Sequence, residues 1–573
     1  MKMMENKKRI AILGGGPSGL FMYKRLVESG STNFEIDIYE RKSTLGAGMP
    51  YSREGANDEH VTNVSDNETP GIATSISEWI LTVPLDLLER FEIDPDKFTE
   101  YKVVPRLLFG YYLADQFKLL QQKGDEAGIT TRIHYQSNVV DISYNEQDNE
   151  VWVETITEKD KFDHVVICTG HNWPLRYEGK VKGYYDAPYP PSKLLLKLNH
   201  PVAIKGSSLT AIDAIRTLAR ENGSFKKDEN GNISFQSHVE SPDFKMIMHS
   251  RSGMLPAVRF HLEDSHLNNN SLLTEKEIEL HRRENDGFLS LDFVFQKDFK
   301  EIFRDKDPDF YNRIKDLSIE DFVLEMMELR ERLEPFQLLK AEYIQAEKSI
   351  KRQESVYWKE MLAVLSFAMN HPAKYLSAED IQRLQKVLMP LISIVIAFVP
   401  QKSCIELLAL HYAGVLDIIP VGAESTVEPQ NGGGIRYNFL DQHNNPQSVF
   451  YETFIDCVGQ PHLSYADFPF KSLLSQKAVS PAKIKFKSSE RGHLAFLEGN
   501  GSVESDSTGS YFLNVSGIAI NDNFQIIDQY GAYNENIFIM AVPYIGGYNP
   551  DYSGLDFCEA VSLRIINSIQ GIN

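Results

Sequence analysis

A glycine-rich turn near the start of the chain limits the fold more than any other feature. Residues 8–41 read KRIAILGGGPSGLFMYKRLVESGSTNFEIDIYER: an apolar run, a G-x-G-x-x-G turn, a helical stretch, a second apolar run and an acid. Gly14 permits the tight turn, Gly16 lets a pyrophosphate approach the backbone, and Gly19 lets the helix pack closely on the strand. Glu40 comes at the end of the second apolar run, a position from which a carboxylate can accept hydrogen bonds from an adenosine ribose. The N-terminus of the helix favours binding of a phosphate. The segment therefore predicts a strand–turn–helix–strand unit that binds a dinucleotide.

Composition and charge narrow the classes of partner. The 573 residues suggest several domains, and the net charge of −21 argues against a nucleic acid or an anionic membrane surface. The four cysteines are far apart and form neither a C-x-x-C nor a zinc pattern, so we expect no metal site and no disulfide-reductase chemistry. The longest apolar run, Val387–Val399, contains Pro390 and is too short to span a bilayer. With no visible signal peptide, we expect a cytoplasmic protein with no membrane span.

Other segments of the first third return toward the same ligand. A second loop of small residues, Gly46–Tyr51, would bring the backbone close to it. Thr131–Tyr144 and Glu150–Thr157 are expected to be the strands of an antiparallel excursion, and the buried run Phe162–Gly170 then ends in Thr-Gly beside the first turn. Arg106 begins a predicted helix; it could form a surface salt bridge or clamp a phosphate or a flavin edge.

A second unit of the same kind begins at residue 201. Pro201–Lys205 is a short buried run, and the turn after it reads G-x-S-x-x-A, starting at Gly206. Ala211 in the last position still allows close packing, whereas the side chain of Ser208 could narrow the phosphate site or donate a hydrogen bond. Arg251 follows the next predicted strand and suits a 2′-phosphate, which favours NADPH over NADH. The alternative is a unit retained for packing, without nicotinamide binding.

The middle of the chain changes character. Thr274–Arg283, Ile319–Leu333 and Phe336–Leu365 are charged and helical in period, which predicts a helical insertion that could roof the cofactor and shape a substrate pocket. Toward the end, Asn536–Ala541 is expected to be the last core strand of the first domain. The loop after it, VPYIGGYNPDYSG, would pass close to the ligand.

In this order, the segments make the chain resemble the FAD-NAD(P)-binding family of two-dinucleotide-domain flavoproteins, a relative of the N-hydroxylating and Baeyer–Villiger flavin monooxygenases. The resemblance rests on GGGPSG, the loop around Asn63, VPRLLFGYYL, ICTGHNWP, and the segments around Gly206 and Arg251, with a weaker match over 450–566. It implies an α/β fold in which a Rossmann-like FAD domain of three layers (ββα) carries an inserted second NAD(P)-type Rossmann domain and a mostly helical insertion. The expected parts are the first part of the FAD domain (1–200), the NAD(P)-type unit (201–265), the helical insertion (266–400), the return of the second unit (401–460) and the closing part of the FAD domain (461–573).

The resemblance also implies where the cofactors bind. FAD would contact Gly14, Gly16, Pro17, Ser18, Gly19, Glu40, Arg41, Arg106, Val139, Thr169 and Gly170. NADPH would use Gly206, Ser208 and Arg251 of the second unit. The groups nearest the flavin ring would be Asn63, Arg106, Gly547 and Tyr548, and no residue can be assigned a catalytic role.

Three functions follow from this interpretation. In the leading one, NADPH reduces FAD, and a C4a-hydroperoxyflavin formed with O2 hydroxylates a small-molecule substrate. In the second, a flavin oxidase or dehydrogenase takes electrons directly from its substrate and does not use nicotinamide. In the third, a non-catalytic FAD-binding sensor or assembly protein uses the helical insertion as a partner surface. The sequence leaves the substrate and the oligomeric state open.

Overall fold

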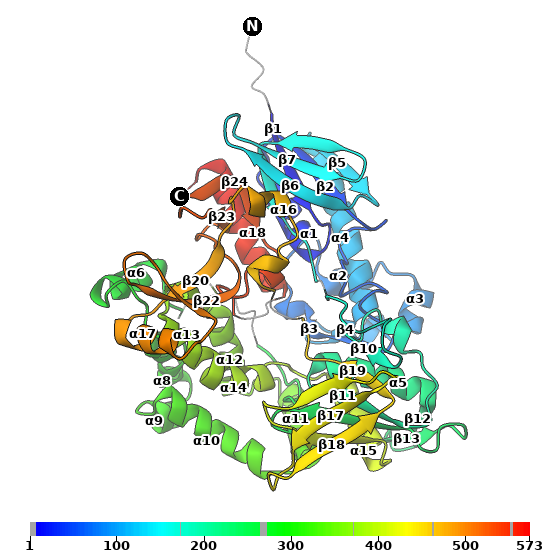
Figure 1. Cartoon of the computed structure of the whole chain (residues 1–573). Helices are drawn as coiled ribbons and strands as arrows, with labels where there is room; N and C mark the ends of the chain where they lie inside the picture. The colour runs from blue at the N-terminus through cyan, green and yellow to red at the C-terminus, as the bar shows by residue number, and fades with distance from the viewer. Residues whose placement is uncertain are drawn as a thin grey trace.

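Three lobes make up the molecule in Figure 1. The computed structural model describes residues 7–171, 173–263, 272–370, 372–460, 463–550 and 554–572. The upper lobe contains the first and the last described elements, the lower right lobe contains the second unit, and the lower left lobe is mostly helical. Among the described residues, no helix combines the length and the apolar character that a membrane crossing requires.

The upper lobe is built on a six-stranded sheet. In spatial order the strands are β5 (Thr130–Tyr135), β2 (Phe34–Glu40), β1 (Lys8–Leu13), β9 (His164–Ile167), β24 (Tyr533–Ile539) and β23 (Gln525–Ile527). All neighbouring strands are parallel except the last pair. The central strands are apolar and rich in β-branched residues, as is typical of parallel strands covered on both faces.

Two further layers cover this sheet. The helices α1 (Pro17–Glu28), α4 (Arg106–Glu126) and α18 (Leu555–Gln570) pack side by side. A separate antiparallel sheet contacts β1, β9 and β24; its strands are β6 (Val139–Asn145), β7 (Glu150–Thr155) and β8 (Lys159–Phe162). The predicted three-layer ββα arrangement is confirmed. Smaller elements of this lobe are β3 (Val61–Ser65), β4 (Val103–Pro105), α2 (Ile76–Ile80), α3 (Leu85–Arg90) and α16 (Lys471–Ser475).

The prediction of one strand over Thr131–Tyr144 is wrong, because the chain divides there between β5 and β6. Gln136 has a positive φ of 52°, and its N–H donates to the carbonyl of Lys42 at 3.0 Å. The N–H of Ser137 donates to the carbonyl of Glu40 at 2.9 Å. The turn is therefore determined by contacts with β2 rather than by a glycine or proline of its own.

The lower right lobe is built on a five-stranded parallel sheet. Its order is β10 (Tyr184–Tyr185), β19 (Thr453–Asp456), β11 (Pro201–Lys205), β14 (Lys245–Ser250) and β15 (Leu416–Pro420). The sheet shares a core with α5 (Leu209–Asn222) and α15 (Gln401–Tyr412). Two antiparallel sheets complete the lobe, β12 (Gly223–Lys227) with β13 (Ile233–Ser237), and β16 (Thr426–Pro429) with β17 (Ile435–Leu440) and β18 (Pro446–Tyr451). The second parallel α/β unit is thus present.

The helical insertion is confirmed; most of it forms the lower left lobe, whereas the helix Pro335–Arg352 packs against α15 of the lower right lobe. Its helices are α6 (Glu275–Glu284), α7 (Leu291–Asp298), α8 (Phe303–Lys306), α9 (Pro308–Ile314), α10 (Ile319–Arg332), α11 (Pro335–Arg352), α12 (Tyr357–Ala368), α13 (Ala378–Arg383) and α14 (Met389–Val395). The expected continuous helix over Phe336–Leu365 is interrupted, because Gln353 adopts a left-handed conformation that ends α11.

A small sheet from the last part of the chain joins the helical lobe. In spatial order it consists of β20 (Pro481–Lys485), β22 (Tyr511–Ile518) and β21 (Val503–Ser505). The helix α17 (Ser489–Leu497) packs against β21 and β22. Ile484, Phe486 and Leu513 lie in the same hydrophobic cluster as the helices of the insertion. Residues 461–573 therefore contribute to two lobes.

A buried histidine on β9 predicts that the folded protein loses stability in acid. Burial lowers the pKa of His164 to about 4, whereas an unfolded chain has an ordinary histidine pKa. The unfolded state therefore binds the proton more readily, and stability is lost as the pH falls from about 6.5 toward 4, by up to about 3 kcal/mol. We expect the melting temperature of His164→Leu to fall less between pH 7 and pH 4.5 than that of the wild type. The control is His443→Leu at an exposed position; an equal fall in all three proteins would contradict the assignment.

Candidate functional site

The first glycine turn has a backbone that only glycine can follow without strain. Gly14 has a φ of 112°, and a Cβ atom there would lie 2.6 Å from the carbonyl oxygen of Cys168. A Cβ atom on Gly19 would lie 2.0 Å from the carbonyl oxygen of Gly14, so α1 and β1 approach as closely as their backbones allow. Gly16 precedes the first residue of α1 and leaves the helix N-terminus open. The tight turn at Gly14 and the close packing at Gly19 are as the sequence predicted, and the role of Gly16 beside a pyrophosphate stays a prediction.

A cavity of about 720 Å³ lies over this turn, within the size range of cofactor sites. Most of the predicted FAD contacts line it, namely Gly14, Gly16, Pro17, Ser18, Glu40, Arg41, Val139, Thr169 and Gly170. Gly19 does not line the cavity; it packs against the turn from behind. The carboxylate of Glu40 accepts hydrogen bonds from the N–H groups of Gly15 and Lys42, both at 2.8 Å, which fix it at the cavity wall.

One buried polar atom in the cavity fits a ligand. The Oγ1 of Thr169 is buried and has no hydrogen-bond partner among the described residues. An unpaired buried hydroxyl costs free energy, so the position suits a ligand that supplies the missing hydrogen bond. Together with the open helix N-terminus and the glycine turn, this hydroxyl makes the cavity suitable for the phosphates and ribose of FAD.

Many lining residues were not predicted as contacts because they are brought in by distant parts of the fold. Gly48, Met49, Pro50 and Tyr51 come from the second small-residue loop, whose close approach was expected, and Val542, Pro543 and Tyr544 come from the expected ligand loop. None of the others was predicted as a contact, although His171 lies in the motif ICTGHNWP; they include Ser137, Asn138, His171, Pro469, Phe470, Met540, Leu555 and Phe557. Burial lowers the pKa of His171 to about 4, so this ring is neutral at pH 7.

The four predicted flavin-ring neighbours do not line the cavity. Arg106 instead forms an ion pair with Asp213, with Nη2 2.5 Å from Oδ2. The backbone carbonyl of Asn63 accepts a hydrogen bond from Arg259. Both residues therefore lie at the junction of the upper lobe with the rest of the molecule.

Gly547 and Tyr548 lie against the small sheet of the helical lobe. A Cβ atom on Gly547 would lie 2.3 Å from the side chain of Val515. The hydroxyl of Tyr548 donates to the carbonyl of Lys483 at 3.0 Å and accepts from its N–H at 3.2 Å. These contacts hold the loop in place, and residues 551–553 of the same loop lie outside the described residues.

The second turn repeats the backbone of the first. Gly206 has a φ of 106°, and a Cβ atom there would lie 2.9 Å from the carbonyl oxygen of Cys457. Ser208 precedes α5 with φ −92° and ψ −168°, close to the −77° and −163° of Gly16 before α1. The side chain of Ser208 makes no capping hydrogen bond. The serine thus stands where the first unit has the glycine that a pyrophosphate approaches.

The strand register places Arg251 at the edge of this turn. Lys205 pairs with His249 as Leu13 pairs with Tyr39. Arg251 therefore takes the position of Arg41, one residue beyond that of Glu40. Its side chain is exposed. A cation here, with no acid at the preceding position, can accept a phosphate on the adenosine ribose.

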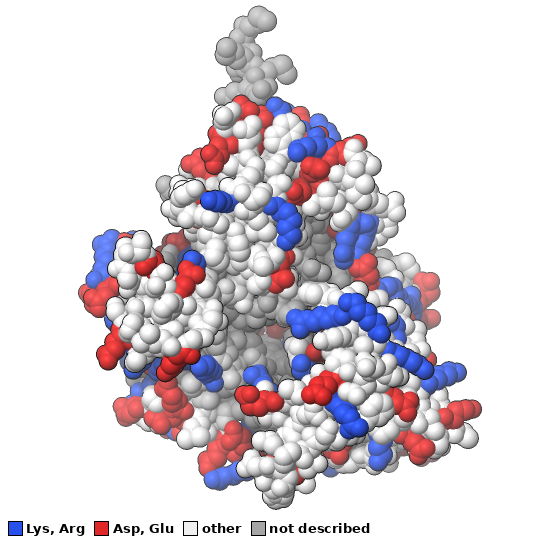
Figure 2. All heavy atoms as spheres, viewed as in Figure 1, with Lys and Arg blue, Asp and Glu red and all other residues white. Residues whose placement is uncertain are grey.

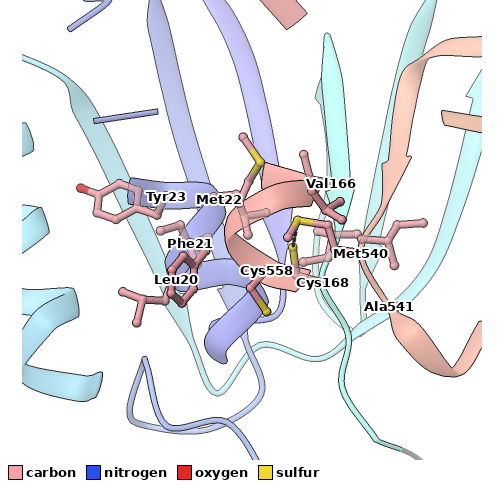
Figure 3. Packing of buried hydrophobic residues seen from close by; sticks show 14 of the residues in the cluster. Leu20, Phe21, Met22, Tyr23, Val166, Cys168, Met540, Ala541 and Cys558 are labelled. Carbon is pink, nitrogen blue, oxygen red and sulfur yellow. Dashed lines mark hydrogen bonds between the residues drawn. The ribbon is translucent and has the colours of Figure 1, made fainter. Parts of the chain in front are cut away.

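Two cysteines far apart in sequence meet at the first cavity. Figure 3 shows Cys168 after β9, Met540 after β24 and Cys558 on α18. The Sγ of Cys168 lies 4.0 Å from the Sδ of Met540, and both cysteines line the cavity. Burial raises the pKa of Cys558 to about 12 and that of Cys168 well above its ordinary value, so both thiols stay protonated. All four cysteines of the chain are buried and free, which excludes a preformed disulfide.

Comparison with known proteins identifies the first domain. Residues 11–172 match the family model described as FAD-NAD(P)-binding. This segment is therefore similar to FAD-NAD(P)-binding domains. The family description names both cofactors expected from the sequence, and FAD is the cofactor that the cavity of this domain fits. Residues 274–396 match a second model, the YdhS-like middle domain, which corresponds to the helical lobe.

One curated relative and two solved structures can be set beside the chain. The protein YdhS of Escherichia coli (strain K12), whose own function is uncharacterized, is 27% identical over 477 residues, covering 82% of this chain and 86% of the relative. L-lysine 6-monooxygenase from Pseudomonas syringae has a TM-score of 0.48 at 12% identity, covering 99% of both chains. Bacillithiol disulfide reductase from Staphylococcus aureus has a TM-score of 0.42 at 9% identity, again covering 99% of both chains.

Proposed function

We propose that this flavoprotein is an oxidoreductase that takes electrons from NADPH and uses O2 to hydroxylate a small organic molecule. The observation that carries the proposal is the pair of turns with the same backbone, at Gly14 and at Gly206, in two parallel α/β units of one chain. Two such units are what a protein needs to hold two dinucleotides at once.

The side chains of the first cavity would hold FAD. Glu40 would accept hydrogen bonds from the adenosine ribose, and the N-terminus of α1 would bind the pyrophosphate. The hydroxyl of Thr169, which has no partner among the described residues, would form a hydrogen bond with the ligand. When bound, FAD supplies two-electron redox chemistry and reactivity toward O2. The surrounding apolar residues, among them Phe470 and Tyr544, would keep water from the reacting groups.

The state of the cysteines argues against a disulfide as the electron acceptor and is in keeping with O2 in that role, the organic substrate being oxidised. A flavoprotein that passes electrons to a disulfide needs two reactive thiols, and the thiols at this cavity are buried and protonated. The surface in Figure 2 is hollowed where the lobes meet, which suits entry of a small molecule. On the same face, acidic and basic side chains are intermixed.

A second candidate rests on Ser208. Because its side chain occupies the position where a pyrophosphate approaches the backbone, the second unit could have lost nicotinamide binding. The protein would then be a flavin oxidase or dehydrogenase that is reduced directly by its substrate.

Anaerobic mixing of the purified flavoprotein with NADPH or NADH tests the proposal. We expect NADPH to bleach the flavin absorbance near 450 nm at least tenfold faster than NADH at equal low concentration, because Arg251 can pair with the 2′-phosphate. Arg251→Ala should raise the apparent Kd for NADPH about tenfold or more and leave that for NADH unchanged. The control is Lys227→Ala, an exposed lysine of the same lobe.

The outcomes separate the hypotheses. A protein purified without flavin, and unable to bind added FAD, would contradict the proposal as a whole. Flavin that neither nucleotide bleaches, but a small molecule does, would favour the oxidase or dehydrogenase. Flavin that resists every reductant except dithionite would favour a sensor or assembly protein. Rapid reoxidation by O2 together with substrate-dependent oxygen uptake would support the hydroxylating activity.

A further inference from the structure

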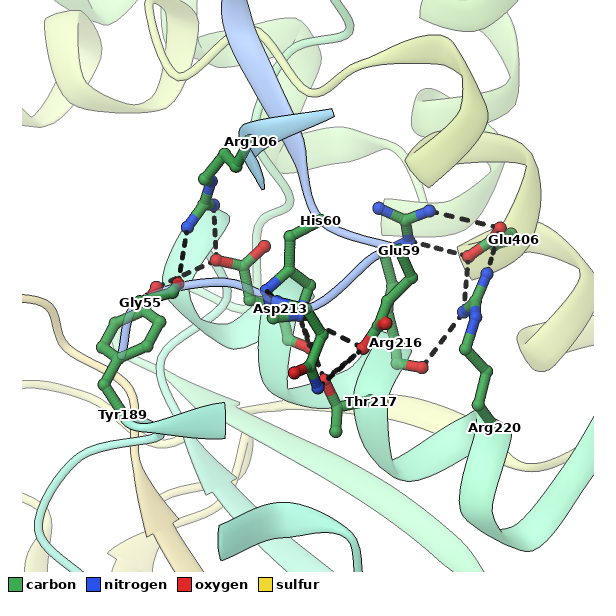
Figure 4. A network of polar contacts seen from close by, with 11 residues as sticks. Gly55, Glu59, His60, Arg106, Tyr189, Asp213, Arg216, Thr217, Arg220 and Glu406 are labelled. Atoms are coloured by element: carbon green, nitrogen blue, oxygen red, sulfur yellow. Dashed lines mark hydrogen bonds and ion pairs between the residues drawn. The ribbon is translucent and has the colours of Figure 1, made fainter. Parts of the chain in front are cut away.

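Helix α5 presents two different polar faces. Arg216 and Arg220 pair with Glu406 of α15, inside the second unit. Asp213 and Thr217, one helical turn apart, point instead toward the upper lobe (Figure 4). Their side chains are almost fully buried, so this contact between lobes is polar and contains little water.

The carboxylate of Asp213 is held from two sides. Its Oδ2 accepts from Nη2 of Arg106 at 2.5 Å and from the hydroxyl of Tyr189 at 2.9 Å. Burial alone would raise the pKa of Asp213, but the charge of Arg106 more than offsets this and the pKa is lowered. Asp213 is therefore ionised at pH 7, and the two lobes meet at a buried ion pair.

A neutral histidine completes the contact. Nδ1 of His60 accepts from the N–H of Asn57 at 3.1 Å, so Nε2 carries the proton. That proton faces the carbonyl of Asp213 at 3.2 Å and Oγ1 of Thr217 at 3.0 Å. The hydroxyl of Thr217 in turn donates to Glu59 at 2.6 Å. Burial lowers the pKa of His60, which agrees with the neutral ring.

The network connects the walls of both dinucleotide turns. Arg106 begins α4, and its N–H donates to the carbonyl of His60 at 2.9 Å. The same helix packs closely against Tyr51, which lines the FAD cavity. The approach is so close that a Cβ atom on Gly110 would lie 2.0 Å from the Tyr51 carbonyl oxygen. At the other end, Asp213 lies in α5 shortly after the turn that contains Ser208. A short rigid path thus joins the two turns.

We propose that Asp213 and Arg106 are positioning residues that fix the nicotinamide turn against the FAD cavity in the geometry for hydride transfer. The inference rests on the proposed use of NADPH: a hydride leaves the nicotinamide, which is oxidised, and reaches FAD, which is reduced. Contacts between domains are usually mobile, whereas a buried ion pair with hydrogen bonds from more than one side favours a single low-energy arrangement. Misplacement by about 1 Å can lower a transfer rate on the order of 100-fold, so a fixed arrangement matters for the rate.

The choice of variant follows from the energetics of buried ion pairs. Removing one partner leaves an uncompensated charge and can unfold the protein, whereas replacing both by apolar residues of similar volume is often neutral. The test variant is therefore the double substitution Arg106→Met with Asp213→Leu. The matched control is Arg216→Met with Glu406→Leu, which removes a buried ion pair of the same helix that lies inside the second unit.

Stopped-flow reduction of the holoenzyme by saturating NADPH is the first measurement. We expect the test variant to keep its FAD, its melting temperature within a few degrees and its Kd for NADPH within about threefold, but to be reduced at least tenfold more slowly. The control should be reduced at the wild-type rate. A test variant that is reduced within twofold of wild type would overturn the proposal, as would equal losses in the two variants.

A distance measurement separates this proposal from the proposed function. The native cysteines are buried, so spin labels can be placed at Lys123→Cys on α4 and Tyr412→Cys on α15, both exposed. We expect one narrow distance distribution in the otherwise wild-type protein and a broadened or shifted one in the test variant. If neither nucleotide reduces wild-type flavin, the proposed function fails and the hydride-transfer role fails with it. If NADPH does reduce wild-type flavin, an unchanged distribution in the test variant overturns the positioning role, and a broadened one together with slower reduction supports it.

Discussion

The Gly14→Ala variant is expected to fold and to be purified almost free of flavin. Its new Cβ atom would lie 2.6 Å from the Cys168 carbonyl oxygen, and a φ of 112° is strained for alanine. To relieve the contact, the turn must move away from β9, and both walls of the cavity at the pyrophosphate position move with it. We expect FAD affinity to fall on the order of 100-fold, with a loss of stability of about 1–3 kcal/mol.

The ratio of flavin to protein absorbance after purification measures this effect, and FAD titration of the apoprotein gives the affinity. Gly71→Ala is the control, because a Cβ atom at Gly71 would have open space around it in the same lobe. It should retain flavin at the wild-type ratio. A Gly14→Ala protein with full flavin content would show that the cavity over this turn does not bind the cofactor.

The second large effect is expected from Glu406→Gln, in the core of the second unit. Burial would raise the pKa of Glu406, but Arg216 and Arg220 hold it at about 2. The glutamine cannot neutralise Arg216, whose side chain is 1% exposed, so we expect a loss of about 3–5 kcal/mol in unfolding free energy. In the wild type, the lowered pKa means that stability is present above the unfolded pKa of about 4.5 and is lost as the pH falls toward 2.

Urea unfolding at pH 7 checks the magnitude, and the double variant Arg216→Met with Glu406→Leu is the comparison. Because it removes both buried charges, it should lie within about 1.5 kcal/mol of wild type. Arg220 then loses its partner, but its side chain is 31% exposed and can be solvated. A single variant as stable as wild type would contradict the assignment of a buried ion pair.

Predictions from local sequence were most accurate where a residue's own backbone decides the structure. The turns at Gly14 and Gly206 require a positive φ, which glycine adopts without cost, and both were found where the pattern indicated them. Pro201–Lys205 has the predicted bounds because a short buried β-branched run between turn residues has few alternatives. Six of the nine predicted cavity residues share this origin, since they lie at the carboxyl end of a strand or in the turn that follows it. Of the other three, Pro17 and Ser18 begin α1 and Val139 begins β6.

Predictions failed where a side chain's partner lies far away in the chain. Arg106 was expected in a surface salt bridge or at the cofactor, and it forms a buried ion pair with Asp213, more than a hundred residues later. The chain turns at Gln136 because the carbonyls of Lys42 and Glu40 accept hydrogen bonds from the N–H groups of residues 136 and 137. Neither glycine nor proline marks the site. Tyr548 is held by the backbone of Lys483, in a sheet whose place in the helical lobe no local pattern showed.

The sequence alone determined that two parallel α/β units with glycine turns are present, because strand period and glycine conformation are properties of short segments. Only the tertiary structure decided how the units are joined and what surrounds the cofactor. Cys168 and Cys558 meet at the cavity, and Arg106 meets Asp213 between the lobes, because helices and strands distant in sequence pack together. Such contacts depend on the burial and charge of both partners at once, and a single stretch of sequence contains only one of them.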